Sequence, residues 1–233
     1  MIAVIDNRMP ERAKSRLWEI CEVAELPPFS ALDKRVASHP DMLMFKLERK
    51  LFVCEAYYRE ARETIDKIIK SSSLELILTD DKFGNQYPQD IKFNTFLINN
   101  TIVGNTKHIS SYLKEYADSI GIALKNVNQG YAKCSTVVLE GAIISADKAI
   151  CKLAEELGAD ALHVSSEGVS LDGYDCGFLG GASGVWKNKV FFCGDISTHT
   201  DFESISAFCN AHGHEVISLS NDPLYDVGTI IFF

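Results

Sequence analysis

Apolar and polar stretches alternate along this chain in a recurring order: two short apolar strands joined by a tight turn, an amphipathic helix, and a third apolar strand. The clearest instance begins at Val127, where VNQGYAKCSTVVLEGAIIS contains a loop, a cysteine and two apolar runs around a Glu-Gly turn. A helical pattern over 146–157 follows, then Gly158 in the position of a C-cap, then the strand ALHVS. This order predicts a three-stranded module with a helical crossover.

Variants of this module recur before and after Val127. Each begins with a predicted hairpin, and Asn99-Asn100 supplies the turn chemistry that a tight hairpin requires. A helical pattern and one more apolar strand follow every hairpin. The hairpins pair MLMFKL with KLFVC, IKFNTFLI with TIVG, and CGFLGG with WKNKVFFCG, and the helices after them cover 55–70, 107–120 and 201–211.

The two ends of the chain complete a fifth module. The apolar run Met1–Ile5 is followed by a helix predicted over PERAKSRLWEICEVA, with Pro10 in its first turn, and the final run VGTIIFF has no hairpin partner downstream. Pairing the first run with the last one supplies the missing hairpin. The residues that enter the five hairpins are 42 to 50 positions apart when counted through the joined ends: Asp41, Asp90, Cys134, Cys176 and Asp226.

The predicted fold is therefore α/β: a five-module α/β propeller of hairpin-helix-strand repeats, closed by the N- and C-terminal strands, in a single domain over 1–233. Repeat periods in the forties suit a propeller. An open solenoid would need polar capping repeats, which neither end supplies. A two-layer α/β sandwich is the competing architecture, but adjacent antiparallel strands argue against a doubly wound sheet.

Composition and charge narrow the classes of partner. A net charge of −9 argues against nucleic acid, because a phosphate-binding surface needs a basic stripe, and it is compatible with a cationic ligand. No apolar run approaches the 18 residues of a membrane span, and the N-terminus does not have the pattern of a signal peptide. Seven cysteines without metal-site spacing favour a reducing compartment. We therefore expect a cytoplasmic protein with no membrane or nucleic-acid partner, no metal and no cofactor.

In a closed ring, the five hairpin-entry residues should converge on one end of the central axis. Three are aspartates and two are cysteines, residue types that bind cations and attack electrophiles. Each also has a purely structural interpretation. An Asp before a hairpin is often a turn or cap residue, and a free Cys is often a small buried hydrophobe.

Two short motifs then resemble a known family. His39-Pro40-Asp41 is similar to the His-x-Asp motif that enters one hairpin in the pentein, or guanidino-group-modifying, superfamily of arginine and agmatine deiminases and dimethylarginine hydrolases. The segment from Gly130 to Cys134 resembles the glycine-preceded cysteine of the same enzymes, two modules further on. Asp226 is similar in place to an Asp that binds the guanidinium there. The five-module ring resembles that fold over the whole chain, as a bacterial branch of the superfamily.

The resemblance implies a small guanidino compound as ligand. Cys134 would attack its central carbon and form a covalent thiouronium intermediate, and His39 would protonate the leaving amine and then activate water. Carboxylates such as Asp41 and Asp226 could hold the planar guanidinium through paired hydrogen bonds. The cationic substrate would itself favour the Cys134 thiolate.

Three further residues are candidates by position. Asp90 and Cys176 occupy the same place in their modules as Cys134, so both are predicted to contact the ligand, and Cys176 is the second candidate nucleophile. Arg35, in the loop before His39, could bind a substrate carboxylate.

The chain also departs from the family pattern. Its candidate nucleophile lies in mid-chain, which requires a circularly permuted order of modules. The Glu-Gly-Gly-Asp element of the hydrolases is replaced by Asp222-Pro-Leu-Tyr-Asp226, which leaves His39 without its expected acidic partner. A catalytically inactive pentein that binds a ligand or partner is therefore the alternative function. Hydrolysis and amidino transfer both stay open, and the outer helices offer a surface through which a homodimer could form.

Overall fold

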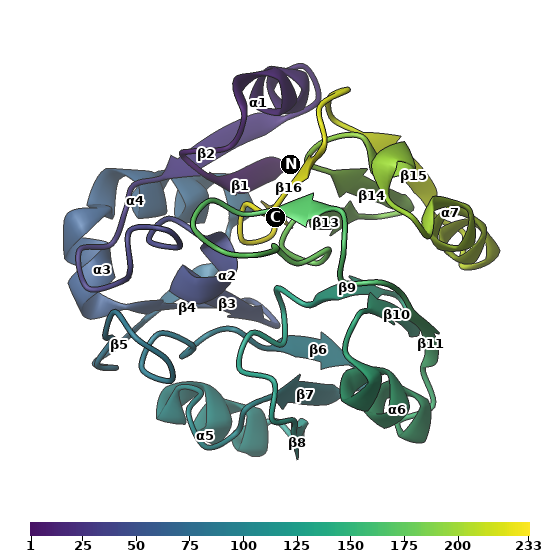
Figure 1. The fold of residues 1–233 in the computed structure, drawn as a ribbon. Helices are drawn as coiled ribbons and strands as arrows, with labels where there is room; N and C mark the ends of the chain where they lie inside the picture. The colour runs from purple at the N-terminus through teal and green to yellow at the C-terminus, as the bar shows by residue number, and fades with distance from the viewer.

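Five small sheets stand around a central axis, and the longer helices cover the outside of the ring (Figure 1). The computed structural model describes residues 1–233. Each sheet has three strands, and a separate two-stranded sheet, β12 (Val169–Ser170) with β16 (Leu224–Tyr225), joins two loops. The prediction of a five-module α/β propeller is confirmed.

The order of strands is the same in every module: a hairpin, then a helical crossover, then a third strand parallel to the second. The strands are β1 (Ile2–Asp6), β2 (Glu22–Leu26) and β17 (Ile231–Phe232); β3 (Met44–Leu47), β4 (Lys50–Cys54) and β5 (Glu75–Thr79); β6 (Phe96–Ile98), β7 (Thr101–Gly104) and β8 (Ala123–Asn126); β9 (Thr136–Leu139), β10 (Ala142–Ser145) and β11 (Asp160–His163); and β13 (Ser183–Trp186), β14 (Lys189–Phe192) and β15 (Glu215–Ser218).

The helices make the crossovers that parallel strand pairs need. In the module of β9, β10 and β11, Ala142 of β10 lies opposite Leu139 of the antiparallel β9 and opposite Asp160 of the parallel β11. The helices are α1 (Glu11–Trp18), α2 (Pro40–Leu43), α3 (Glu55–Glu60), α4 (Arg62–Ser72), α5 (Ser111–Ser119), α6 (Lys148–Glu156) and α7 (Phe202–Ala211), with the 3₁₀ turn η1 (Ile196–Thr198) before α7. None of these helices is long and apolar enough to cross a membrane.

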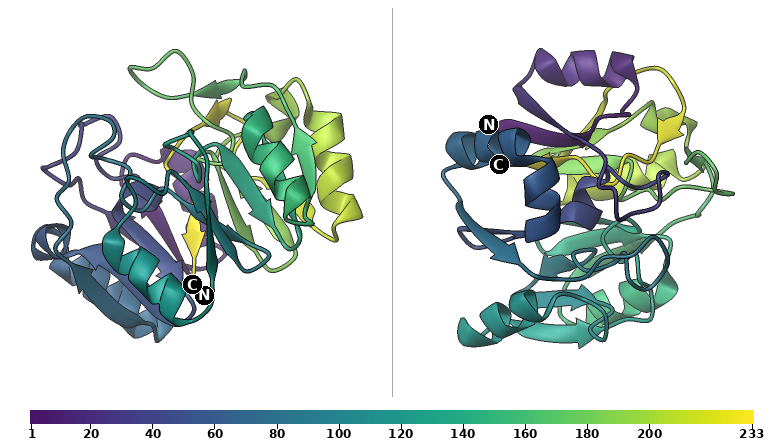
Figure 2. Two further views of the ribbon diagram at one scale, coloured as in Figure 1. Left: turned by 90° about the horizontal axis from the view of Figure 1, so that it is seen from below. Right: turned by 90° about the vertical axis from the view of Figure 1, so that its left-hand side faces the viewer.

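The ring closes through its termini, which lie side by side (Figure 2). β1 is antiparallel to β17, with Val4 opposite Ile231, and parallel to β2, with Val4 opposite Ala24. Ile2 and Phe233 exchange two backbone hydrogen bonds of 2.9 Å each. The predicted pairing of the first and last apolar runs is confirmed.

The predicted extent of two helices and of one hairpin was wrong. The strand expected at CGFLGG lies instead at Ser183–Trp186, which pairs with Lys189–Phe192. The helix expected through Ala24 ends at Trp18, and Glu22–Leu26 forms β2 instead. Val23, Ala24 and Leu26 are buried beside β1, so pairing with that strand overrides the local helical pattern. The helix expected over 55–70 is interrupted at Ala61, which separates α3 from α4.

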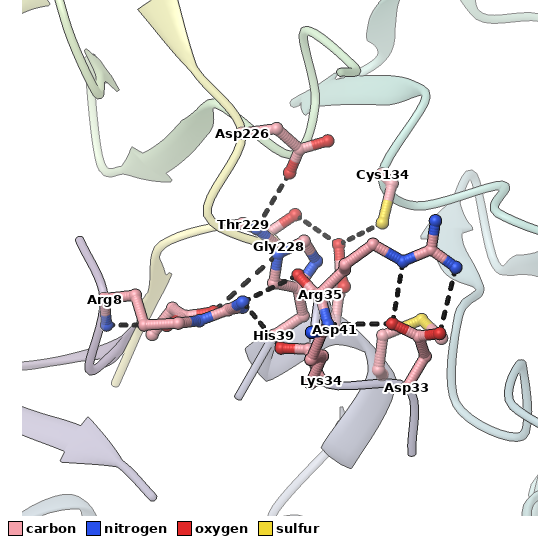
Figure 3. Close-up of polar contacts among 12 residues, drawn as sticks. Arg8, Asp33, Lys34, Arg35, His39, Asp41, Cys134, Asp226, Gly228 and Thr229 are labelled. Atoms are coloured by element: carbon pink, nitrogen blue, oxygen red, sulfur yellow. Dashed lines mark hydrogen bonds and ion pairs between the residues drawn. The ribbon is translucent and has the colours of Figure 1, made fainter. Parts of the chain in front are cut away.

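Apolar side chains fill the space between sheets and helices, whereas polar side chains are buried near the axis. The largest apolar cluster has 27 residues and includes Phe52, Tyr57 and Phe93. The buried polar residues of the axis come from the turns before β3 and β6 and from the closing loop before β17: His39, Asp41, Asn94, Asp226 and Thr229. Figure 3 shows His39, Asp41, Asp226 and Thr229. Because buried polar groups need partners, this cluster is where the candidate site is found.

Candidate active site

The closing loop of the ring holds the His-x-Asp turn in place. His39 precedes the short helix α2, and the backbone N–H of Asp41 donates to Gly228 O at 3.0 Å. Gly228 has φ +65°, and an added Cβ there would lie 2.1 Å from His39 Cβ. Only glycine permits this approach. The last strand of the chain thus positions two residues that entered the ring almost 190 positions earlier.

Asn94 holds Cys134 on the turn before β9. Its Oδ1 accepts the backbone N–H groups of Lys133 at 2.9 Å and Cys134 at 3.3 Å, and its Nδ2 donates to Cys134 Sγ at 3.0 Å. Asn94 is fully buried, and Cys134 is 3% exposed. The cysteine therefore sits on a backbone turn that a neighbouring module fixes with a single side chain.

A chain of hydrogen bonds connects Cys134 to the other side of the axis (Figure 3). Cys134 Sγ donates to Asp41 Oδ2 at 2.9 Å, and Thr229 Oγ1 donates to the same oxygen at 2.8 Å. Lys133 Nζ donates to Thr229 Oγ1 at 3.2 Å. Burial, followed by the negative charges of Asp41 and Asp226, raises the pKa of the Cys134 thiol well above its ordinary value. Burial lowers the pKa of Lys133. The thiol is therefore protonated in the unliganded site.

One cavity of about 140 Å³ contains four of the predicted site residues: His39, Cys134, Cys176 and Asp226. Its other lining residues are apolar or aromatic: Val36, Met42, Tyr131, Leu171, Tyr174 and Phe178. Three of the four predicted residues are buried there, whereas Cys176 is exposed. The structure thus brings a thiol, an imidazole and a carboxylate into one small pocket.

Backbone groups fix the carboxylate of Asp226 in this cavity. The N–H of Gly228 donates to Oδ1 and that of Phe178 donates to Oδ2, each at 2.9 Å. Burial raises the pKa of Asp226. Gly181 packs directly on the carboxylate, because an added Cβ at Gly181 would lie 2.0 Å from Asp226 Oδ1. The backbone at Gly181 therefore approaches the Asp226 carboxylate closely.

An acidic neighbour of His39 comes from the first strand. His39 Nε2 lies 3.7 Å from Asp6 Oδ2, and Asp6 also pairs with Arg8. Nε2 has no hydrogen-bond partner. The sequence motifs did not point to Asp6, because it approaches His39 only through the packing of the first module against the second. Its one local signal is an acidic residue at the end of a buried apolar strand.

The remaining predicted residues lie behind or outside the lining of the cavity. Asp41 faces a second cavity, of about 190 Å³, which Lys133 also lines. Asp90 Oδ2 accepts the hydroxyl hydrogen of Tyr131 at 2.8 Å, and burial raises the pKa of Asp90. Arg35 pairs with Asp33 at 2.8 Å. A role in ligand binding stays a prediction for each of these residues.

Three donor atoms of the site are also close enough to share one ion. A nitrogen of His39, an oxygen of Asp41 and the sulfur of Cys134 lie within 4.8 Å of one another, and all three residues are buried. Nitrogen, oxygen and thiolate donors are those that zinc prefers, although the protonated thiol would first have to lose its proton.

Comparison with known proteins places this geometry in context. The profile of a family of unknown function (DUF6873) matches residues 4–231. No curated protein matches the chain in sequence. Among solved structures, one similar chain is dimethylarginine dimethylaminohydrolase from Pseudomonas aeruginosa, as a cysteine-to-serine mutant in complex with citrulline. It has 11% sequence identity and a TM-score of 0.58, and the match covers 94% of this chain and 91% of that one.

Two further structures have similar scores. A histidine-to-glycine dimethylarginine dimethylaminohydrolase, as an adduct with S-methyl-L-thiocitrulline, has 9% identity and a TM-score of 0.60, covering 94% of this chain and 91% of that one. SxtG, an amidinotransferase of saxitoxin biosynthesis from Microseira wollei, has 12% identity and a TM-score of 0.56, covering 92% and 76%. At these identities the similarity establishes the shared fold, the pentein propeller.

Proposed function

We propose that this chain, which belongs to the DUF6873 family of unknown function, is an enzyme that hydrolyses a small guanidino compound, or transfers its amidino group, through Cys134. The observation that carries the proposal is the shared cavity of Cys134, His39 and Asp226 on a pentein ring. The structural neighbours are named as an aminohydrolase and an amidinotransferase, so both outcomes are chemically consistent with the fold.

The electrostatics of the site favour a cationic ligand. Asp41, Asp90 and Asp226 are buried near the axis, and burial raises the pKa of both Asp90 and Asp226. The cavity lining contains no Lys or Arg. A cation bound beside Asp226 would offset the cost of these buried charges. A guanidinium is planar and offers several N–H donors in one plane, so it can pair with a carboxylate and still expose its central carbon.

The same cation would activate the thiol. With positive charge in the cavity, the Cys134 proton can pass along the 2.9 Å hydrogen bond to Asp41 Oδ2, leaving a thiolate. The thiolate attacks the central guanidinium carbon, and His39 protonates the nitrogen that leaves as the C–N bond breaks. Asp6, 3.7 Å from His39 Nε2, is close enough to stabilise positive charge on the imidazole.

The resulting S-thiouronium intermediate is then released by a second attack. His39, now neutral, takes a proton from a water molecule, whose oxygen bonds to the same carbon. The C–S bond breaks, and Cys134 regains its proton from Asp41. The products of hydrolysis are a urea derivative and an amine or ammonia. In amidino transfer, an acceptor amine attacks in place of water.

The alternative, a non-catalytic ring that binds a ligand, is favoured by one observation. The Cys134 thiol donates to a carboxylate in a buried site, and its raised pKa opposes thiolate formation. In that case a guanidinium would bind without changing the reactivity of Cys134.

Paired alkylating agents separate the two functions. 2-Chloroacetamidine is cationic and 2-chloroacetamide is its neutral counterpart, and free N-acetylcysteine is the reference for solution reactivity. We expect the cationic agent to modify Cys134 at least about tenfold faster than the neutral one, a difference of about 1.4 kcal/mol. Modification is followed at each cysteine by peptide mass spectrometry. The preference should be small for N-acetylcysteine, and at Cys134 it should be lost in Asp226→Asn.

Turnover is tested in the same samples. Guanidines are incubated with the parent chain and with Cys134→Ser, and urea, ammonia and the amine are measured together with the mass of the intact protein. The proposal expects product formation that depends on Cys134 and a thiouronium adduct on that residue. Absence of both the charge preference and the adduct across the panel would leave only the binding function.

A further inference from the structure

A cation whose charge is already paired stacks on one of the aromatic residues that line the cavity. The Arg35 guanidinium lies over the ring of Tyr174, with Cζ 4.3 Å from the ring centroid, and Tyr174 lines the cavity. Arg35 Nε donates to Asp33 Oδ1 at 2.8 Å, and Nη2 donates to Asp33 Oδ2 at 2.9 Å. Figure 3 shows this two-point pair. Such bidentate pairs are among the stronger hydrogen-bonded contacts in proteins.

The backbone of a second loop completes this arrangement. Arg35 Nη1 donates to Gly173 O at 3.0 Å. Gly173 has φ +80°, and an added Cβ there would lie 2.7 Å from Arg35 Cδ, so glycine is needed for the loop to approach the arginine. The hydrogen bonds from Arg35 hold the pKa of Asp33 at about 2, so the pair stays charged at neutral pH. Three of the five Arg35 N–H donors are thereby in use, and a ligand carboxylate would meet a guanidinium whose charge Asp33 already neutralises.

The cavity is apolar apart from the reactive groups. Tyr131 and Phe178 pack against each other with ring centroids 6.3 Å apart, and Val36 and Leu171 complete the outer lining. A cavity of about 150 Å³ accommodates a molecule the size of benzene. The 140 Å³ here is therefore enough for a guanidinium and a short apolar substituent.

We propose that the compound bound in this cavity is an N-alkyl or N-aryl guanidine without a carboxylate, and that Asp33 sets this selectivity by keeping Arg35 paired. The guanidinium faces Asp226 and Cys134, and the apolar substituent lies among the aromatic rings beneath the Arg35–Asp33 pair. A carboxylate there would lose its hydration without gaining a free cation. This inference rests on the proposed function, because it takes the guanidino group as the one that is recognised.

Two ligands that differ only at one end test the selectivity. Butylguanidine ends in a methyl group, and 4-guanidinobutanoate ends in a carboxylate at the same position. Their dissociation constants are measured by isothermal titration calorimetry on the Cys134→Ser chain, which excludes turnover. We expect butylguanidine to bind at least about tenfold more tightly.

The Asp33→Asn variant then releases Arg35. In this variant the affinity for 4-guanidinobutanoate should rise at least about fivefold, while that for butylguanidine should change less than twofold. Asp66→Asn is the matched control, because Asp66 pairs with Arg62 at 3.6 Å on the exposed face of α4. In Asp66→Asn, the ratio of the affinities for butylguanidine and 4-guanidinobutanoate should equal the ratio in the parent.

The outcomes distinguish this inference from the proposed function. Equal or tighter binding of 4-guanidinobutanoate by the parent, or a ratio that Asp33→Asn leaves unchanged, overturns the selectivity alone. Failure of every guanidine to bind overturns both proposals. Selective binding without turnover in the chain that retains Cys134 removes the catalytic role and supports the selectivity.

Discussion

Asn94 is the side chain on which the position of Cys134 depends, so its replacement gives a quantitative test of the site. Asn94→Leu keeps approximately the same size but removes the acceptor for two buried backbone N–H groups, those of Lys133 and Cys134. It also removes the donor that faces Cys134 Sγ. Because Asn94 is fully buried, water cannot replace these partners.

The expected cost follows from the number of groups left without partners. Each buried N–H without an acceptor costs about 1–3 kcal/mol, so the two together should lower the free energy of unfolding by about 2–6 kcal/mol. For a chain of 233 residues, each kcal/mol corresponds to about 2–4 °C in Tm. The variant should therefore unfold at least about 4 °C below the parent.

Urea denaturation followed by circular dichroism measures the free energy of unfolding, and calorimetry measures Tm. Asn210→Ala is the control, because Asn210 is exposed on α7 and its replacement should change stability by no more than about 0.5 kcal/mol. A loss below 1 kcal/mol in Asn94→Leu would refute the reasoning that this amide holds the turn.

A second variant separates stability from reactivity. Asn94→Asp keeps an oxygen for the two N–H groups but replaces the donor next to Cys134 Sγ with an acceptor. Since the Asn94 hydrogen bond lowers the pKa of Cys134, its loss should slow alkylation of Cys134 relative to Cys176. An unchanged ratio of rates at the two cysteines contradicts this role.

Two further replacements test the buried carboxylates. Tyr131→Phe removes the hydrogen bond to Asp90, whose pKa burial already raises. A raised pKa in the folded state makes stability fall as pH rises, because the ionised carboxylate is the form that burial disfavours. The variant should therefore lower the free energy of unfolding by about 1–3 kcal/mol at neutral pH and by less at acidic pH. Tyr58→Phe removes a 2.8 Å hydrogen bond to Asp66 at the surface and should have little effect at either pH. Urea denaturation measures both variants, and equal losses of unfolding free energy in Tyr131→Phe and Tyr58→Phe would disprove the burial argument. Gly181→Ala should displace Asp226 and abolish the preference for chloroacetamidine, and labelling rates like those of the parent would show that the carboxylate can move without consequence.

Most of the hairpins, most of the helices and the closure of the ring could be predicted from the sequence, because each depends on a local pattern. Alternating apolar runs with turn residues between them indicate strands, and regular spacing through the joined ends indicates five modules. β2 is the exception. Its residues continue a helical pattern, and only the presence of β1 beside them makes the strand more favourable.

The site was predictable in its residue types and only partly in its contacts. Three of the five hairpin-entry residues, Cys134, Cys176 and Asp226, line one cavity, and His39 of the His-x-Asp motif lines it with them. Asp41 and Asp90 do not. The relation of Cys134 to Asp41 was not predictable, because the two are 93 positions apart and their 2.9 Å hydrogen bond depends on the relative placement of two modules. The same applies to Asn94, 40 positions before Cys134.

The sequence by itself thus determined the modules, their number and the residues that enter each hairpin, since short-range periodicity specifies which face of a strand or helix is buried. Only the tertiary structure decided how these residues meet. Thr229 reaches Asp41 across 188 positions because ring closure brings the end of the chain to the axis. Asp6 approaches His39 because the first module packs against the second. The charge state of Cys134 follows from that placement, since burial beside two carboxylates is a property of the assembled ring.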